Sequence, residues 1–392
     1  MDRRQVLHTA QRYGTTEAWV FVLYVALAVG AVISQYLKTA AHPSDLYPQY
    51  NGYLILKSAF VHLRHHHNLY AWYRQEYWDL YKYSPTFAVF FAPLTWLPDW
   101  LGMTVWNVIN AASLFCAIHS LPVLTSAVKA SILVFSCLAL LVSLQHFQSN
   151  GVMAALIILS FSFLLREKIL LATFCLVLSS FIKIFGVCAC VVFCLFPHRR
   201  QAGLCALLWV MVLACVPLVF ISGAELVWQY ANWLTVLQDD HTASDGLSVI
   251  SWLKNWFGID GHKTLIQATG VGLLCLPLLK TNAYEQRGFR LGMLSSVLMW
   301  VIIFNHKAET ATFVIAVCGC ALWYYTSPKT LLDTVLLLAV FLVTCLSPTD
   351  LFPTWLRTEV FKPYALAVVP VIGLWIKLNY DLVWPAGTTA RV

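Results

Sequence analysis

The chain has 392 residues, of which 60% are hydrophobic and 11% are charged, and its formal net charge is +7. Soluble domains contain about 45–50% apolar and about 25% charged residues, so no soluble core absorbs this much apolar surface. The composition excludes a soluble globular protein and predicts an all-α protein that crosses a membrane many times.

Apolar runs recur along almost the whole chain. Since a helix needs about 20 mainly apolar residues to cross a bilayer, we predict about twelve membrane spans within one transmembrane domain, residues 1–392. The predicted spans are 18–37, 101–120, 127–144, 151–165, 169–182, 184–196, 203–221, 264–279, 291–304, 311–325, 331–346 and 364–378. The span assignment of residues 169–196 has two alternatives, because these residues supply either two short spans around Lys183 or one long tilted span.

Three arginines, Arg3, Arg4 and Arg12, precede the first apolar run. That run is long enough to remain in the membrane, whereas the apolar part of a cleavable signal is shorter. We therefore predict an anchor that is also the first span.

The basic residues between spans indicate the orientation, because short cytoplasmic loops are enriched in Lys and Arg. They all fall on the cytoplasmic side if the N-terminus is cytoplasmic, residues 85–97 are not a span and the Lys183 region crosses twice. These basic residues are Arg3, Arg4, Arg12, Lys129, Arg166, Lys168, Arg199, Arg200, Lys280, Arg287, Arg290 and Lys329. Residues 85–97 are too short for a span and are flanked by prolines. We predict that both termini are cytoplasmic and that the positive charge reflects topology rather than binding to nucleic acid.

Two long segments, 38–100 and 222–263, are predicted as loops on the outer side. Both are rich in Trp and Tyr, as interfacial segments are. In the second loop, one apolar face of a short surface helix is predicted from Trp252, Leu253, Trp256 and Phe257. Such a face anchors the loop to the bilayer, or borders a lipid substrate.

Three polar breaks between spans fall on the same outer side: Gln148-Ser149-Asn150, Lys183, and His306-Lys307-Ala308-Glu309. Ionisable groups at the edge of the hydrocarbon are costly unless they are paired or hydrated, so these breaks are candidate functional sites. A phosphate would pair with Lys183, and an outward-facing phosphate with a hydrocarbon tail implies a lipid phosphate. The alternative is a Lys183 side chain that extends to the membrane surface.

Several motifs resemble those of a known family. Tyr81-Lys82-Tyr83-Ser84-Pro85-Thr86-Phe87, Ala92-Pro93-Leu94, Leu97-Pro98-Asp99-Trp100 and Trp106-Asn107-Val108-Ile109-Asn110 are similar to the motif after the first outer loop of glycosyltransferase family 87. Gln148-Ser149-Asn150-Gly151, Ile182-Lys183-Ile184-Phe185 and Phe304-Asn305-His306-Lys307-Ala308-Glu309-Thr310 resemble later motifs of that family. Its members are integral-membrane glycosyltransferases of the GT-C superfamily and include mycobacterial polyprenol-phosphate-mannose-dependent mannosyltransferases. The resemblance covers most of the chain.

The resemblance implies a GT-C-like fold with juxtamembrane helices in a large first outer loop and a cavity that opens to the outer face. It implies a mannose-like hexose or a pentose on a polyprenyl-phosphate donor, and an envelope glycan or glycolipid as acceptor. It also implies a multi-pass protein of the bacterial cytoplasmic (inner) membrane, whose chemistry needs neither a nucleotide nor a metal.

The chemistry that the resemblance implies requires a carboxylate that accepts the acceptor hydroxyl's proton and cations that stabilise the departing phosphate. The candidates for the phosphate are Lys183, His306 and Lys307. Further substrate-binding candidates are Gln148, Asn150, Tyr83 and His241.

The base is where the chain departs from the family pattern. Family members carry an Asp about 20 residues before a motif like Asn68-Leu69-Tyr70, but that position falls near Asn51, whose amide is not a base. The candidate bases are therefore Asp45, Asp79 and Glu309. Asp79 also has a structural interpretation, because it can pair with Lys82 in a short helix.

Two other polar clusters are interpreted mainly as surface. His62, His65, His66 and His67 offer favoured metal ligands, yet no Cys or carboxylate lies at ligand spacing, so a solvated interfacial run is predicted. The acidic cluster of the second loop either contacts acceptor hydroxyls or is solvated; it comprises Asp239, Asp240, His241, Ser244 and Asp245. The twelve cysteines lie in or beside apolar runs and are interpreted as core hydrophobes.

Two rival functions stay open. A transporter or lipid flippase would use Lys183, His306 and Glu309 as an intramembrane polar site. The long first outer loop and the lack of a detectable inverted repeat argue against it. A non-catalytic scaffold or lipid-binding subunit is the other rival, which the amide at Asn51 keeps open.

Overall fold

The computed structural model describes residues 3–384, and the described residues form helices and no strands. The α-helices are α1 (Arg3–Ala41), α2 (Asn51–Arg64), α3 (Pro85–Phe90), α4 (Ala92–Thr95), α5 (Asp99–His119), α6 (Ser126–Gln145), α7 (Asn150–Leu164), α8 (Ile169–Ile182), α9 (Arg199–Cys215), α10 (Gly223–Ala243), α11 (Val249–Phe257), α12 (Lys263–Cys275), α13 (Arg287–Ile303), α14 (Phe313–Thr326), α15 (Leu331–Ala339), α16 (Thr354–Leu356) and α17 (Val369–Val383). The prediction of an all-helical protein is confirmed for the part of the chain that is described.

Shorter 3₁₀ and π segments extend or join these helices. The 3₁₀ segments are η1 (Ile184–Leu195), η2 (Val216–Val219), η3 (Leu276–Leu279), η4 (Thr281–Ala283), η5 (Thr310–Thr312) and η8 (Leu366–Val368). The π segments are η6 (Val340–Leu346) and η7 (Arg357–Phe361).

Each predicted span coincides with a helical segment of the structure. Among the described residues, five helices are long and apolar enough to cross a membrane: Thr16–Ala41, Asp99–His119, Ser126–Gln145, Arg199–Val219 and Leu366–Val383. Several other apolar helices are shorter, including α7, α8, η1 and α14. A multi-pass membrane protein is therefore supported, whereas the number of about twelve crossings stays a prediction.

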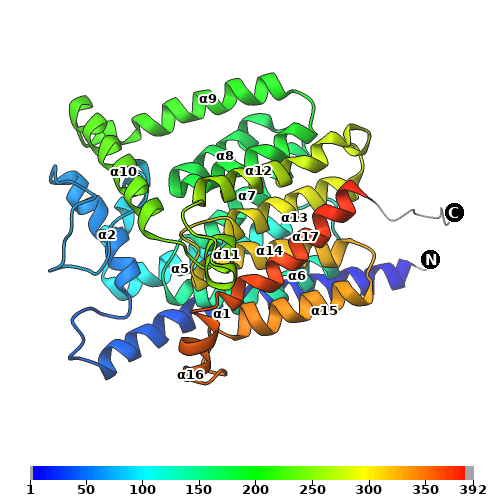
Figure 1. Ribbon diagram of the computed structural model, residues 1–392, viewed down its shortest axis with the longest axis horizontal. Coiled ribbons are helices and arrows are strands. Elements are labelled where there is room, and N and C mark those ends of the chain that lie inside the picture. Colours follow the sequence, from blue (N-terminus) through cyan, green and yellow to red (C-terminus); the bar gives the residue numbers. More distant parts are fainter. Residues whose placement is uncertain (1–2, 385–392) are drawn as a thin grey trace.

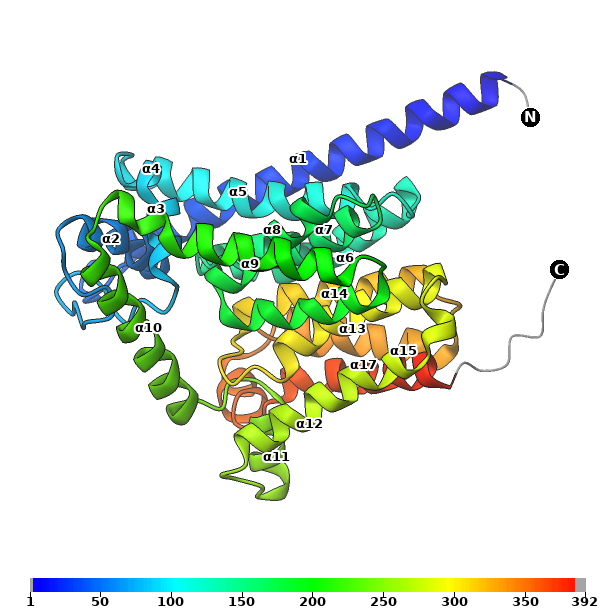
Figure 2. The same ribbon diagram turned by 90° about the horizontal axis from the view of Figure 1, so that it is seen from above.

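The apolar helices run side by side in a bundle, and the two described ends of the chain lie at the same end of it (Figures 1 and 2). Helices α2 and α10 lie at the opposite end (Figures 1 and 2). The hairpin of α13 and α14 is the most enclosed part, with side chains from Leu291 to Ile303 and from Phe313 to Trp323 buried. Its connecting loop, residues 304–309, therefore reaches the α2 end of the bundle from the centre of the core.

The basic loops gather at the end of the bundle that holds the termini. There the guanidinium of Arg290 lies 4.4 Å from the centre of the Phe196 ring, and that of Arg199 lies 5.8 Å from the Tyr284 ring. Lys129 Nζ donates to the carbonyl of His119 at 2.7 Å. This separation of basic loops from polar breaks agrees with the predicted topology, whose orientation in the membrane stays a prediction.

Residues 85–97 form two short helices, as expected of a segment that is not a span. Ser84 caps α3 by accepting a hydrogen bond from the Phe87 N–H at 3.2 Å, and Pro85 occupies the first helical turn. Helices α3 and α4 contain 6 and 4 residues. The first loop therefore carries the short helices α2, α3 and α4 that the family resemblance implies.

The chain turns back on itself at Lys183, which separates α8 from η1. Lys183 is extended, with φ −139° and ψ 123°, and a Cβ on Gly186 would lie 2.6 Å from Ser179 Oγ. This close return requires glycine and starts a reversal. The end of η1 then lies beside the end of α7, because the ring centres of Phe196 and Phe161 are 6.0 Å apart. The geometry agrees with a double crossing.

Helix α10 is the main element that the sequence prediction missed, since residues 222–263 were interpreted as a loop with one short helix. Ser222 accepts from the Glu225 N–H at 3.3 Å, and the Glu225 carboxylate accepts from the Ser222 N–H at 3.4 Å. This reciprocal cap is readable as Ser-x-x-Glu. The predicted surface helix is present as α11, with Trp256 and Phe257 exposed.

Candidate functional site

A cavity of about 320 Å³ opens at the α2 end of the bundle, where the three polar breaks meet the first loop and α10. Its wall contains seven of the residues that the sequence singled out: Asp79, Tyr83, Gln148, Lys183, His306, Lys307 and Glu309. Asn150 and His241 lie directly behind this wall, in contact with Lys183 and His306 respectively. The structure therefore brings nine of the ten candidates together.

Gln148 forms hydrogen bonds to both Lys183 and the Glu309 carboxylate. Its Nε2 donates to Glu309 Oε2 at 2.9 Å, while its Oε1 accepts from Lys183 Nζ at 3.3 Å. Lys183 Nζ also donates to Asn150 Oδ1 at 2.7 Å. Asn150 is oriented by donating its own Nδ2 to the carbonyl of Ala311 at 2.8 Å. Both hydrogen-bond acceptors of Lys183 are thus neutral amides, which leave its charge available for an anion.

Two further lysines are held by carboxylates. Lys82 Nζ lies 2.9 Å from Asp79 Oδ1 and 3.3 Å from Asp240 Oδ1, and Lys307 Nζ lies 3.0 Å from the same Asp240 oxygen. Burial acts to lower the pKa of Lys82, but Asp79 and Asp240 outweigh it and raise the pKa above its usual value. The sequence left Asp240 open as an acceptor contact or a solvated residue, and it did not assign Lys82 to the site, although Lys82 lies within the Tyr81–Phe87 motif.

His306 and His241 meet edge to face, with ring centres 4.8 Å apart. Burial, reinforced by His241, lowers the pKa of His306 to about 4. The ring is therefore neutral near pH 7. A neutral imidazole can donate an N–H hydrogen bond but carries no charge, whereas His306 was predicted among the cations of the site.

One residue of the same cavity wall, Asn305, has a buried donor without a hydrogen-bond partner among the described residues. Asn305 is 7% exposed, and this donor is its Nδ2. An unpaired buried amide costs about 1–3 kcal/mol, so a ligand that accepts a hydrogen bond here would recover this free energy. Asn305 was not among the predicted site residues.

The three candidate bases occupy different environments. Asp45 is exposed, accepts a hydrogen bond from Gln49 Nε2 at 3.2 Å and does not belong to the described cavity wall. Asp79 belongs to the wall but binds Lys82, which confirms the predicted pair, although the two residues lie in a non-helical segment rather than in the expected short helix. Glu309 belongs to the wall and accepts from a neutral amide. Of the three, Glu309 is the carboxylate that faces the cavity with a neutral partner.

Asn51 lies in the cavity wall at the start of α2, and it holds the Trp78 segment of the first loop against this helix. Its Nδ2 donates to the Trp78 carbonyl at 2.7 Å, and its Oδ1 accepts from the Trp78 N–H at 2.7 Å. A carboxylate at this position has no donor for the Trp78 carbonyl. The amide therefore has a structural role that an Asp cannot fill.

The histidine run of the first loop is only partly solvated. His65, His66 and His67 are exposed, as predicted, but His62 is 4% exposed, so the prediction is wrong for His62. His62 Nε2 bonds Glu76 at 3.1 Å, because the next loop folds over α2. His66 Nδ1 bonds Glu225 of α10 at 2.9 Å, which joins the two outer loops.

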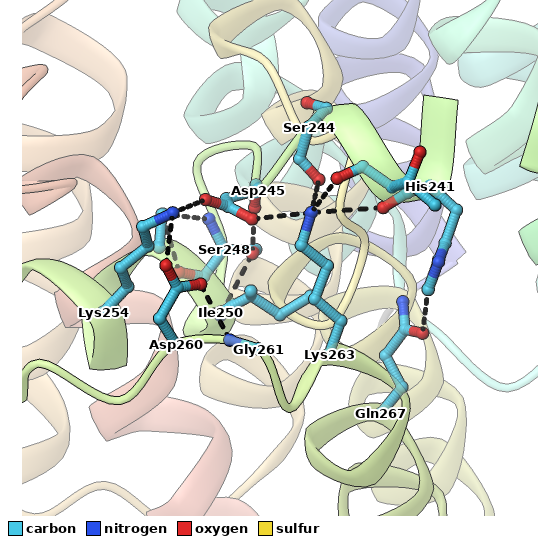
Figure 3. A network of polar contacts seen from close by, with 12 residues as sticks. His241, Ser244, Asp245, Ser248, Ile250, Lys254, Asp260, Gly261, Lys263 and Gln267 are labelled. Carbon is cyan, nitrogen blue, oxygen red and sulfur yellow. Dashed lines mark hydrogen bonds and ion pairs between the residues drawn. The ribbon is translucent and has the colours of Figure 1, made fainter. Parts of the chain in front are cut away.

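The second loop is fastened by an ion-pair network between α10, α11 and α12 (Figure 3). Lys263 Nζ donates to the carbonyls of Thr242 at 2.8 Å and Ser244 at 3.1 Å, which end α10, and pairs with Asp245 at 2.8 Å (Figure 3). Lys254 pairs with the same carboxylate at 3.0 Å. Burial acts to raise the pKa of Asp245, but the hydrogen bonds from Lys263 and Lys254 outweigh it and lower the pKa.

The backbone of the second loop lies directly against the loop that carries Glu309. Gly246 has φ +58°, and a Cβ on it would lie 2.6 Å from the His306 oxygen. The Leu247 N–H donates to the Ala308 carbonyl at 2.7 Å. A side chain at position 246 would meet both backbone strain and a steric clash. This contact closes one side of a second cavity of about 880 Å³, whose wall also contains Glu309.

The family model of glycosyltransferase family 87 matches residues 81–348. This range contains Lys82, the three polar breaks and α10. No curated protein matches the chain.

Proposed function

The chain belongs to glycosyltransferase family 87, and on this premise we propose that it transfers a mannose-like hexose or a pentose from a polyprenyl-phosphate carrier. We propose an envelope glycan or glycolipid as acceptor, and a reaction on the extracytoplasmic face of the bacterial cytoplasmic membrane. The family assignment by itself carries the coarser conclusion, a membrane glycosyltransferase.

The observation that carries the donor proposal is the environment of Lys183. Its ammonium faces the cavity with neutral amide acceptors, while the next residue, Ile184, lines the cavity and is 47% exposed. Val187, further along η1, is 50% exposed. A charge that binds phosphate beside an exposed apolar helix suits a phosphate that carries a hydrocarbon chain.

The proposed reaction is a substitution at the anomeric carbon of the donor sugar. The acceptor oxygen forms a bond to C1 as the bond between C1 and the phosphate oxygen breaks, and the electron pair leaves with the polyprenyl phosphate. Glu309 takes the proton of the acceptor hydroxyl. Lys183 stabilises the charge that develops on the phosphate, with Lys307 and the Asn305 amide as further donors. In this scheme lysines supply the charge, and neither a metal nor a nucleotide is required.

The direct test is a transfer assay with the purified protein in vesicles. We expect radiolabelled sugar to move from polyprenyl-phosphate mannose, or from the corresponding pentose donor, onto acceptors in membranes extracted from the source organism. Absence of transfer with every donor would contradict the proposal. Flux of the intact donor across sealed vesicles, without sugar transfer, would instead support the transporter or flippase.

The predicted orientation has its own test, because the two ends of the bundle carry exposed residues suited to labelling. Ser44 lies in the first loop and Lys329 lies in the loop before α15, and both are exposed. In intact cells we expect a membrane-impermeant maleimide to label Ser44→Cys, and Lys329→Cys only after permeabilisation. The unsubstituted protein measures the background from its exposed cysteines, Cys116, Cys190 and Cys215. The reverse labelling pattern would overturn the orientation.

A further inference from the structure

We propose that the second cavity, on the other side of Glu309, binds the acceptor, and that it selects a membrane-anchored glycan whose headgroup carries an anionic group. The inference rests on the proposed function, because it identifies the second substrate's site for the same carboxylate.

Glu309 is the residue that joins the two cavities, since it belongs to the wall of both. The first cavity holds Lys183 and the apolar start of η1, whereas the second is built from the second outer loop and the segment between η6 and η8. A base must contact the hydroxyl that it deprotonates. A residue that borders the proposed donor site and also belongs to the wall of the second cavity therefore suits an acceptor bound in that second cavity.

The size of the second cavity, and the polar groups in its mostly apolar wall, suit the headgroup of a glycolipid. Its volume of about 880 Å³ falls within the range of about 300–1,000 Å³ that is usual for ligand sites. Its wall carries hydroxyl and amide side chains, from Ser251, Asn255, Ser347, Thr354 and Thr358. Sugar hydroxyls are recognised by such groups, which both donate and accept hydrogen bonds.

The charges of this wall favour an anionic headgroup. Apart from Glu309, its ionisable residues are Arg357 and Lys362. Arg357 Nη1 lies 3.1 Å from Asp350, whose side chain is 85% exposed. Because the Asp350 carboxylate lies in solvent, this pair contributes little free energy, although the Arg357 side chain is only 27% exposed. The guanidinium can therefore exchange Asp350 for a phosphate or carboxylate, which it binds in a bidentate manner.

The surroundings of the cavity suit an acceptor that remains in the membrane. Exposed apolar side chains flank it, with Trp256 49%, Phe257 59% and Trp355 63% exposed. Trp256 Nε1 donates to the Tyr364 carbonyl at 2.8 Å, which joins α11 to the segment that carries Arg357. Aromatic residues of this kind concentrate at the membrane surface. Arg357 itself begins the π segment η7, an irregular form that recurs at functional sites.

Photoreactive derivatives of two compounds test the inference. A derivative of octyl mannoside 6-phosphate probes the second cavity, and a derivative of a short-chain polyprenyl-phosphate mannose probes the first. We expect the octyl probe to crosslink to residues 347–367, and unlabelled octyl mannoside to compete at least tenfold more weakly than its 6-phosphate. Thr358→Trp fills the second cavity and should lower crosslinking of the octyl probe at least tenfold. Glu359→Trp is the matched control, because Glu359 is exposed and lies outside the cavity wall.

Arg357→Gln removes the positive charge of Arg357 but retains a polar side chain in the wall of the second cavity. We expect it to abolish the preference for the phosphorylated probe while the donor probe binds as before. The inference is overturned if Thr358→Trp leaves crosslinking of the octyl probe unchanged, or if Arg357→Gln and Lys362→Gln together preserve the preference. Lys183→Met should reduce binding of the donor probe alone. Unchanged donor binding in that variant would count against the proposed function itself, so the two failures are distinguishable.

Discussion

Glu309→Gln is expected to lower kcat/KM for sugar transfer by about 10²–10⁴-fold, the usual contribution of a general base. The substitution keeps the size of the side chain and an oxygen that accepts from Gln148, whose Nε2 lies 2.9 Å from Glu309 Oε2. It removes the negative charge and the ability to take a proton, and it replaces one acceptor oxygen with an NH₂ donor. The measurement is initial-rate transfer by purified protein, with donor binding determined separately and expected to be unchanged.

The other candidate bases serve as comparisons for Glu309→Gln. Asp45→Asn changes an exposed group outside the described cavity wall and is expected to leave kcat unchanged. Asp79→Asn weakens the hold on Lys82 and is expected to act mainly on KM for the donor. Glu359→Gln controls for loss of an exposed carboxylate. If Asp45→Asn abolished transfer while Glu309→Gln retained it, the base would lie in the first outer loop instead.

Lys183→Met is expected to lower kcat/KM by about 10²–10³-fold, as does the loss of one preorganised donor to a developing negative charge. Methionine has an unbranched side chain one atom shorter than that of lysine and carries no charge. The lost hydrogen bonds end at neutral amides, Asn150 and Gln148. The effect on folding should therefore be small, because removing a costly ammonium offsets the two acceptors that are left unpaired.

The measurement for Lys183 compares transfer with binding of the free polyprenyl phosphate. Both should weaken in Lys183→Met and recover partly in Lys183→Arg, which restores the charge but alters the geometry. Lys329→Met is the matched control, since Lys329 is exposed and lies at the opposite end of the bundle, over the Tyr324 ring. Normal polyprenyl-phosphate binding in Lys183→Met would count against the proposed function, whose donor site rests on Lys183.

Much of the fold was predictable because the apolar runs are local features of the chain. Each predicted span coincides with a helical segment, and the short helices α3 and α4 agree with the prediction that residues 85–97 are not a span. Helix α10 was missed although its cap, Ser222 with Glu225, is readable, because an amphipathic surface helix has no long apolar run. The 3₁₀ geometry of η1 was not predictable, because it depends on the close return of Gly186 against Ser179.

The grouping of the candidate site was also predictable in part. Alternation of spans across a membrane places every second connection on the same side, so Gln148, Lys183 and Glu309 were expected near one another before any contact was known. The structure brings them into one hydrogen-bonded chain. Their catalytic and binding roles remain predictions for the variants described above.

The sequence by itself determined the membrane class, the helical segments and the end of the bundle where polar breaks gather, because hydrophobicity and span alternation are properties of the chain read in order. Only the tertiary structure decided which charged side chains form ion pairs and which have neutral partners and can bind a substrate. Asp240, distant in sequence, pairs with both Lys82 and Lys307, whereas Lys183 meets neutral amides. It also placed Glu309 between two cavities. Such pairings depend on distances between segments far apart in the chain, and no periodicity along the sequence encodes them.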